Sequence, residues 1–158
     1  MNNNDILRRL RFAFDFSNKE AVDLFMLDPN SSFKLNRDEF LARIAKEDDD
    51  IYTECSDVEL CCFLDGLIVS KRGLREPLPP KVEKKEGYRL SKNDILKKLR
   101  IAVNLREDEM LKTLENGGTI LSKSELSALF RNPNHKHYRA CGNQVLRNFI
   151  KGLTKRLR

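Results

Sequence analysis

The chain of 158 residues has no hydrophobic run that could cross a membrane, since none approaches the roughly 18 apolar residues that a span requires. Its first residues, Met-Asn-Asn-Asn-Asp, lack the basic segment and the apolar core of a signal peptide. We therefore expect a cytoplasmic protein with no membrane partner. In that compartment Cys55, Cys61, Cys62 and Cys141 are predicted to be reduced thiols, although the cysteine count leaves a disulfide between Cys55 and Cys141 open.

The motifs of the common enzyme classes are also missing. The chain contains no Gly-rich phosphate loop, no Gly-x-Ser-x-Gly elbow and no His-Glu-x-x-His pair. Cys61 and Cys62 remain as candidate nucleophiles, but a nucleophilic thiol needs a base beside it, and residues 1–70 contain no histidine. We therefore expect no enzymatic activity and no cofactor.

Two sets of candidate metal ligands are incomplete. His135, His137 and Cys141 supply three ligands, and the chain has no further histidine, whereas a structural zinc site takes four protein ligands. Residues 28–39 resemble a calcium loop with Glu39 at its last position, but phenylalanine replaces the glycine at which such a loop turns sharply. We therefore expect no metal ion.

The chain does contain an internal repeat. Asn4–Phe14 returns as Asn93–Val103, at an offset of 89 residues. A second set returns at an offset of 86 residues: Tyr52, Cys55, Leu60, Phe63, Gly66 and Leu67 become Tyr138, Cys141, Leu146, Phe149, Gly152 and Leu153. Residues shared by both copies are expected to serve the scaffold, so chemistry that only one copy carries stands out against them.

Each copy predicts four helices and no strand. Ile6, Leu7, Leu10 and Phe14 recur at the spacing of a single helical face. The predicted helices cover approximately residues 5–14, 18–26, 37–46, 57–70, 92–104, 107–115, 123–130 and 143–156. The sequence therefore predicts an all-α protein, a tandem duplication of a four-helix repeat with about eight helices and no sheet.

Most of the predicted helix starts carry a capping box, in which a polar cap side chain and an acidic residue three positions later satisfy each other's backbone N–H groups. The pairs are Asn2–Asp5, Ser17–Glu20, Asn36–Glu39, Ser56–Glu59, Ser91–Asp94 and Ser122–Glu125. The helix that starts near Gly142 lacks such a pair.

A charged, Pro-rich junction separates the copies, because Pro77, Pro79 and Pro80 are incompatible with a helix interior. We expect an N-terminal helical repeat over 1–70, a linker over 71–90 and a C-terminal helical repeat over 91–158. Domains of about 60 residues have marginal cores, so the two repeats are expected to pack together.

The two copies have opposite charge. Residues 1–76 hold 11 Lys+Arg and 16 Asp+Glu, a net charge of −5, whereas residues 77–158 hold 19 and 8, a net charge of +11. Such opposite charge favours docking of one repeat on the other, and a basic surface of this kind also favours phosphates.

The basic residues of the second copy form the candidate site. Arg147, Lys151, Lys155 and Arg158 follow one helical stripe, and the segment 131–139 mixes cations with His and Tyr rings, as nucleic-acid contact surfaces often do. The predicted contacts to RNA or DNA are Arg131, Lys136, Arg139, Arg147, Lys151, Lys155 and Arg158. A solvated basic face is the other explanation of the same residues.

Two further interpretations remain open. The protein is an interaction or self-association module if the acidic repeat of one chain meets the basic repeat of another protein or another copy. Arg8, Arg9 and Arg11 return as basic residues at 97, 98 and 100, which indicates either a shared ligand contact or a shared soluble surface.

The two copies open and close with the same motifs. Asn-Asp-Ile-Leu, two basic residues and Leu-Arg open the copies at Asn4–Arg11 and Asn93–Arg100, and a Phe-x-x-Gly-Leu pattern closes them at Phe63–Leu67 and Phe149–Leu153. With these motifs the chain resembles the YehS-like family of small bacterial proteins of unknown function. The resemblance covers nearly the whole chain. It implies a tandem domain in a bacterial cytoplasm and no established activity, so it carries over no catalytic residue.

Overall fold

The structure is a computed structural model that describes residues 1–28, 33–74 and 87–158. Within these ranges the chain forms α-helices and no β-strand. The first repeat contributes α1 (Asn3–Ala13), α2 (Asn18–Leu27), α3 (Arg37–Ile44) and α4 (Asp57–Arg72). The second repeat contributes α5 (Lys92–Val103), α6 (Glu107–Gly117), α7 (Lys123–Leu129) and α8 (Asn143–Leu157). The predicted all-α fold with a duplicated four-helix repeat is confirmed.

The helix starts form largely as predicted. In α1, α2, α3, α5 and α7 the cap side chain and the acidic residue three positions later exchange both hydrogen bonds of the capping box. At α4 only half of the box forms, with Ser56 Oγ accepting from the Glu59 N–H at 3.1 Å. The Glu59 carboxylate instead accepts from Nε and Nη2 of Arg43 in α3, at 3.0 and 3.2 Å. A bidentate guanidinium contact outweighs a single backbone N–H.

α4 runs past its predicted end, to Arg72. Lys71 and Arg72 suit this last turn because cations are favoured at the negative end of the helix dipole. The chain leaves the helix at Gly73, whose φ of 78° is reached without strain only by glycine. The rest of the predicted linker is only partly described, since residues 75–86 lie outside the described residues.

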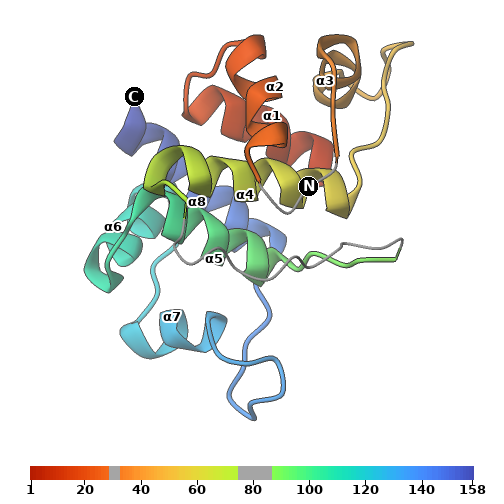
Figure 1. The fold of residues 1–158 in the computed structure, drawn as a ribbon. Coiled ribbons are helices and arrows are strands. Elements are labelled where there is room, and N and C mark those ends of the chain that lie inside the picture. The colour runs from red at the N-terminus through yellow and green to blue at the C-terminus, as the bar shows by residue number, and fades with distance from the viewer. Residues whose placement is uncertain (29–32, 75–86) are drawn as a thin grey trace.

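Helices of the two repeats pack against each other along two equivalent contacts. α4 lies against α5, and α1 lies against α8. Since α5 repeats α1 and α8 repeats α4, exchanging the repeats converts one contact into the other. Figure 1 shows α4 and α8 in the middle, with α2 and α3 on one side and α6 and α7 on the other. The single chain therefore has approximate two-fold symmetry.

One hydrophobic core extends through both repeats. Leu7 and its repeat Leu96 are fully buried in it, as are Leu67 and its repeat Leu153. Because a single repeat is too small to bury a large core, the two repeats stabilise each other by sharing one. This is the packing together that the length of each repeat predicts.

The doubled asparagine of the Asn-Asp-Ile-Leu motif is a buried structural amide. Asn4 Nδ2 donates to the carbonyl oxygens of Arg43 and Thr53, both at 2.9 Å, and Asn4 Oδ1 accepts from the Cys55 N–H at 2.9 Å. Asn93 makes the three equivalent bonds in the second repeat, at 2.8 to 2.9 Å. Each amide ties the third helix of its repeat to the loop that leads into the fourth.

The repeated glycines of α4 and α8 allow close contact between helices. A Cβ at Gly66 would lie 1.7 Å from Leu24 O in α2, and a Cβ at Gly152 would lie 1.8 Å from Thr113 O in α6. Both distances are far inside van der Waals contact, so any larger residue would push the two helices apart. The shared glycines are therefore scaffold residues, like the shared asparagines.

Candidate anion-binding groove

The seven basic residues predicted to contact nucleic acid fall into two groups in space. One group lies in the loop between α7 and α8, and the other lies on α8 and at its end. In Figure 1 the loop lies at the opposite end of the molecule from the C-terminus of α8. The loop group is Arg131, Lys136 and Arg139, and the α8 group is Arg147, Lys151, Lys155 and Arg158. The fold does not bring all seven onto one surface.

The two arginines of the loop group hold the loop in place. Arg131 Nη1 donates to His137 O at 3.0 Å, and Arg139 Nη1 pairs with Glu125 at 3.2 Å. The hydrogen bonds that the Glu125 carboxylate accepts from Ser122, with the Arg139 contact in addition, lower its pKa. Both arginines therefore have a structural role beside any contact with a ligand.

The α8 group forms an exposed cationic stripe. Arg147, Lys151 and Lys155 are exposed and stand one helical turn apart. Lys155 Nζ donates to Asn116 O at the end of α6, at 3.0 Å. This partner is a neutral carbonyl, and no carboxylate of the described residues forms an ion pair with Lys155.

Arg158 joins the end of α8 to the end of α1. Its Nη1 donates to Phe12 O at 2.7 Å and lies 3.3 Å from Asp15 Oδ1. Its guanidinium carbon lies 4.4 Å from the centroid of the Phe12 ring, within the range of a cation–π contact. This contact fixes the position of α1 beside α8.

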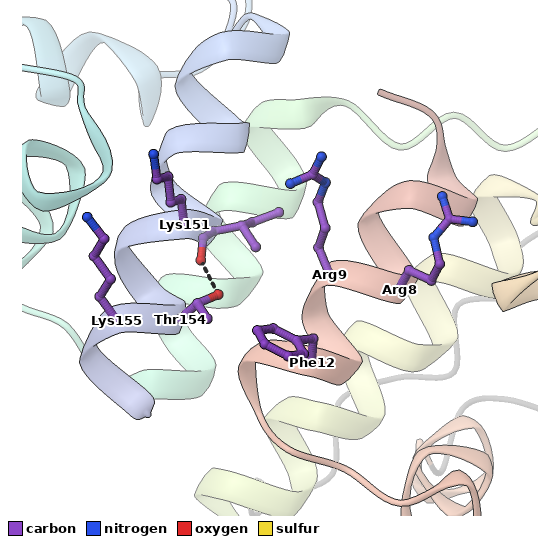
Figure 2. Close-up of a pocket in the computed structure, with 7 residues that line it drawn as sticks. Arg8, Arg9, Phe12, Lys151, Thr154 and Lys155 are labelled. Carbon is purple, nitrogen blue, oxygen red and sulfur yellow. Dashed lines mark hydrogen bonds between the residues drawn. The ribbon is translucent and has the colours of Figure 1, made fainter. Parts of the chain in front are cut away.

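A groove of about 460 Å³ separates the exposed faces of α1 and α8. Figure 2 shows its lining, in which Arg9 and Lys151 extend from the two facing helices toward the same end of the groove, while Arg8 points away from α8. The lining residues are Arg8, Arg9 and Phe12 from α1 and Ile150, Lys151, Thr154 and Lys155 from α8. Four of these side chains are cationic, and the described lining contains no carboxylate.

The charges of the groove are unequally compensated. Arg8 pairs with Asp5 of its own helix and donates to Ala45 O at 3.0 Å. Among the described residues, no carboxylate forms an ion pair with Arg9 or Lys151. The uncompensated positive charge is therefore concentrated at the end of the groove toward which these two side chains extend.

The basic residues of α1 are visible in the sequence, but the sequence did not predict that they share a surface with the α8 stripe. The first repeat is acidic as a whole, so Arg8 and Arg9 stood outside the predicted site. Their recurrence as basic residues in both repeats was the one available signal. Only the contact between α1 and α8 brings them into the lining of one groove with Lys151.

Comparison with known proteins gives the same two repeats. The model of the family described as "Protein of unknown function (DUF1456)" matches residues 3–73 and again residues 92–158. The chain belongs to the DUF1456 family. It is also 36% identical, over 156 residues, to "Uncharacterized protein YehS" of Escherichia coli (strain K12), and the match covers 99% of this chain and 96% of that protein. No solved structure matches the chain. The resemblance to the YehS-like family is confirmed.

All four cysteines of the two DUF1456 repeats are buried, and Cys55 and Cys141 are free thiols. The disulfide between Cys55 and Cys141 that the sequence leaves open is therefore not formed. Burial raises the pKa of Cys55, and it raises the pKa of Cys141 to about 11. Cys61 and Cys62, the candidate nucleophiles, are 0% and 2% exposed, and a thiol without solvent access is a poor nucleophile.

The metal candidates do not assemble in the described part of either DUF1456 repeat. No group of three His, Cys, Asp or Glu side chains that could hold a metal ion occurs among the described residues. His135 Nδ1 accepts from the His137 N–H at 3.0 Å, while Cys141 is buried. Of the segment that resembles a calcium loop, residues 29–32 lie outside the described residues.

None of the helices in the described ranges combines the length and the apolar character that crossing a membrane requires.

Proposed function

We propose that the protein is a non-enzymatic module that binds nucleic acid along the face formed by α1 and α8. The observation that carries this proposal is the lining of the groove, where four cations and an exposed phenylalanine lie together. Cationic grooves with exposed aromatic rings suit nucleic acid because cations contact phosphates and rings stack on bases. The α8 stripe continues this surface beyond the groove.

The shape of the surface favours single strands over duplexes. The cations come from both sides of a concave groove, which can follow one extended backbone. Phe12 is 59% exposed at the edge of the groove, so an unpaired base can stack on the ring face that the Arg158 guanidinium does not cover. Contacts of this kind carry little sequence preference.

The proposal is tested by fluorescence-anisotropy titration with labelled single- and double-stranded RNA and DNA. Binding that weakens from about 50 to 200 mM salt is expected, because phosphate contacts release counterions. A single strand should bind more tightly than the duplex of the same sequence. Absence of binding to every strand type at low salt would contradict the proposal.

A charge-removal variant locates the contact surface. Replacing Arg147 and Lys155 by glutamine removes two exposed cations of α8, so the slope of log affinity against log salt should shrink by about 1.4 for a single strand. The matched control replaces Lys97 and Lys123, two exposed lysines outside the groove, by glutamine. Equal slopes for the two variants would show that the α8 stripe is not the contact surface.

A second candidate is self-association or binding of another protein through opposite charges. One observation favours it: Glu47, Asp48, Asp49 and Asp50 are all exposed after α3, and the equivalent loop of the second repeat exposes Lys136 and two histidines. The acidic loop of one chain can meet the basic loop of a partner chain. Sedimentation velocity at low and high salt tests this, because a salt-sensitive oligomer is expected here and a monomer is expected for a pure nucleic-acid binder.

A further inference from the structure

The two-fold symmetry of the chain relates the α1/α8 groove to a second contact, between α5 and α4. In the repeat, Arg9 is equivalent to Lys98 and Lys151 is equivalent to Asp65. In the second contact these positions form an ion pair, with Lys98 Nζ 2.5 Å from Asp65 Oδ1. The two side chains are only 24% and 21% exposed, so this pair lies in the seam between the repeats. The symmetry thus gives an internal reference for the groove.

The same position in the groove holds two cations and lacks the carboxylate. Lys151 stands where the other contact has Asp65, and it lines the same groove as Arg9, with both side chains extending toward the same end of the groove (Figure 2). Two like charges in one groove repel each other, and a bound anion relieves that repulsion. One scaffold position therefore carries an internal anion in one copy and only positive charge in the other.

The residues that follow these two positions along α4 and α8 also differ in polarity. Three and four residues after Asp65, α4 has isoleucine and valine, at residues 68 and 69. The equivalent residues of α8 are Thr154 and Lys155, which supply a hydroxyl and a further cation. The α1/α8 groove therefore has a hydroxyl and a cation at positions where the other contact has two apolar side chains.

We propose that the groove holds a phosphate monoester between the Arg9 guanidinium and the Lys151 ammonium, at the position that the Asp65 carboxylate occupies in the other contact. Charge selects this ligand class. In the other contact Lys98 pairs with a carboxylate, whereas Arg9 and Lys151 together carry two positive charges. A phosphate monoester carries about −1.5 to −2 charges at neutral pH, and a nucleic-acid backbone phosphate carries one. Guanidinium also suits phosphate oxygens through bidentate bonds.

Two sources present this group, a free mononucleotide and the phosphorylated end of a strand. The assignment does not require nucleic acid to be the natural ligand, since it rests on the comparison of the two contacts. Isothermal titration calorimetry of the full chain with inorganic phosphate, AMP and adenosine tests the site itself. Phosphate and AMP are expected to bind and adenosine is not, because only the first two carry the anion.

The strand source is tested by anisotropy with one oligonucleotide in two forms, with a 5′-phosphate and with a 5′-hydroxyl. Tighter binding of the phosphorylated form is expected if strand ends use the site. This inference is overturned if the two forms of the oligonucleotide bind equally and neither AMP nor inorganic phosphate binds. That result would still support the proposed function. If AMP binds and neither oligonucleotide does, the proposed function fails and the phosphate site stands.

The decisive variant is Lys151→Asp, which gives the groove the residue type of the other contact. It should form an internal ion pair with Arg9, keep or raise the melting temperature, and weaken AMP binding by more than about tenfold. The matched control Lys123→Asp makes the same change of charge at an exposed position of α7 and should leave binding unchanged. Arg9→Gln supplies a second variant, with the same expected loss of binding. Undiminished AMP binding by Lys151→Asp and Arg9→Gln overturns the assignment.

Discussion

The buried amide of Asn4 gives a quantitative test of why the repeat motif recurs. Asn4→Ala removes three hydrogen bonds, to Arg43 O, Thr53 O and the Cys55 N–H, each 2.9 Å long. At about 1 kcal/mol for each bond, the free energy of unfolding should fall by about 3 kcal/mol. For a domain of this size that corresponds to a melting temperature lower by about 6 to 12 °C.

Urea denaturation followed by far-UV circular dichroism measures this loss. Asn143→Ala is the matched control, because Asn143 is an exposed residue in the first turn of α8, and its stability should change by less than about 0.5 kcal/mol. The repeat also supplies a replicate, since Asn93→Ala removes the three equivalent bonds. If both buried variants are as stable as the control, the asparagines do not hold the scaffold, and their recurrence needs a functional explanation.

Three other outcomes are expected from the structure. Gly152→Ala places a Cβ 1.8 Å from Thr113 O, so it should cost at least about 3 kcal/mol of stability in the same urea assay. A smaller loss would show that α6 and α8 can separate freely. Arg43→Leu alone leaves the Glu59 carboxylate unpaired and should cost about 3 kcal/mol of stability. Adding Glu59→Val gives this position the apolar pair that the second repeat has there, and it should recover most of the loss in a double-mutant cycle. Burial raises the pKa of Cys141 from 9.0 to about 11, so the folded protein keeps a proton that the unfolded chain loses first, and stability should fall as the pH rises through this interval. Between about pH 9 and 11, the free energy of unfolding of Cys141→Ala should fall by about 2 kcal/mol less than that of the unchanged protein. Identical pH profiles of the two proteins would refute this contribution.

The helices and most of their starts could be predicted from the sequence, because the signals that set them are local. A cap side chain and its acidic partner lie three residues apart, so neighbouring residues decide whether a box can form. The exception at α4 shows the limit of such signals. Glu59 is in the right place for a box, but Arg43, which lies 16 residues away in the chain and belongs to α3, takes its carboxylate.

The candidate site could be predicted only in part. The stripe of Arg147, Lys151 and Lys155 follows from helical spacing alone, and the structure shows all three exposed. Their neighbour Arg9 could not be assigned, because helical periodicity defines the apolar face of a helix and does not say which distant helix covers it. The contact between Arg158 and Phe12 spans 146 residues, a separation over which no sequence spacing is informative.

The sequence by itself determined the helical class, the duplication, the shared scaffold residues and the opposite charges of the two copies. Only the tertiary structure decided that α1 packs against α8 and α4 against α5. The physical reason is that the apolar faces of the two repeats are equivalent. Burial therefore favours a shared core but does not specify which helix of one repeat packs against which helix of the other. That pairing places Lys151 opposite Arg9 and Asp65 opposite Lys98, so one seam carries an ion pair and the other an open cationic groove.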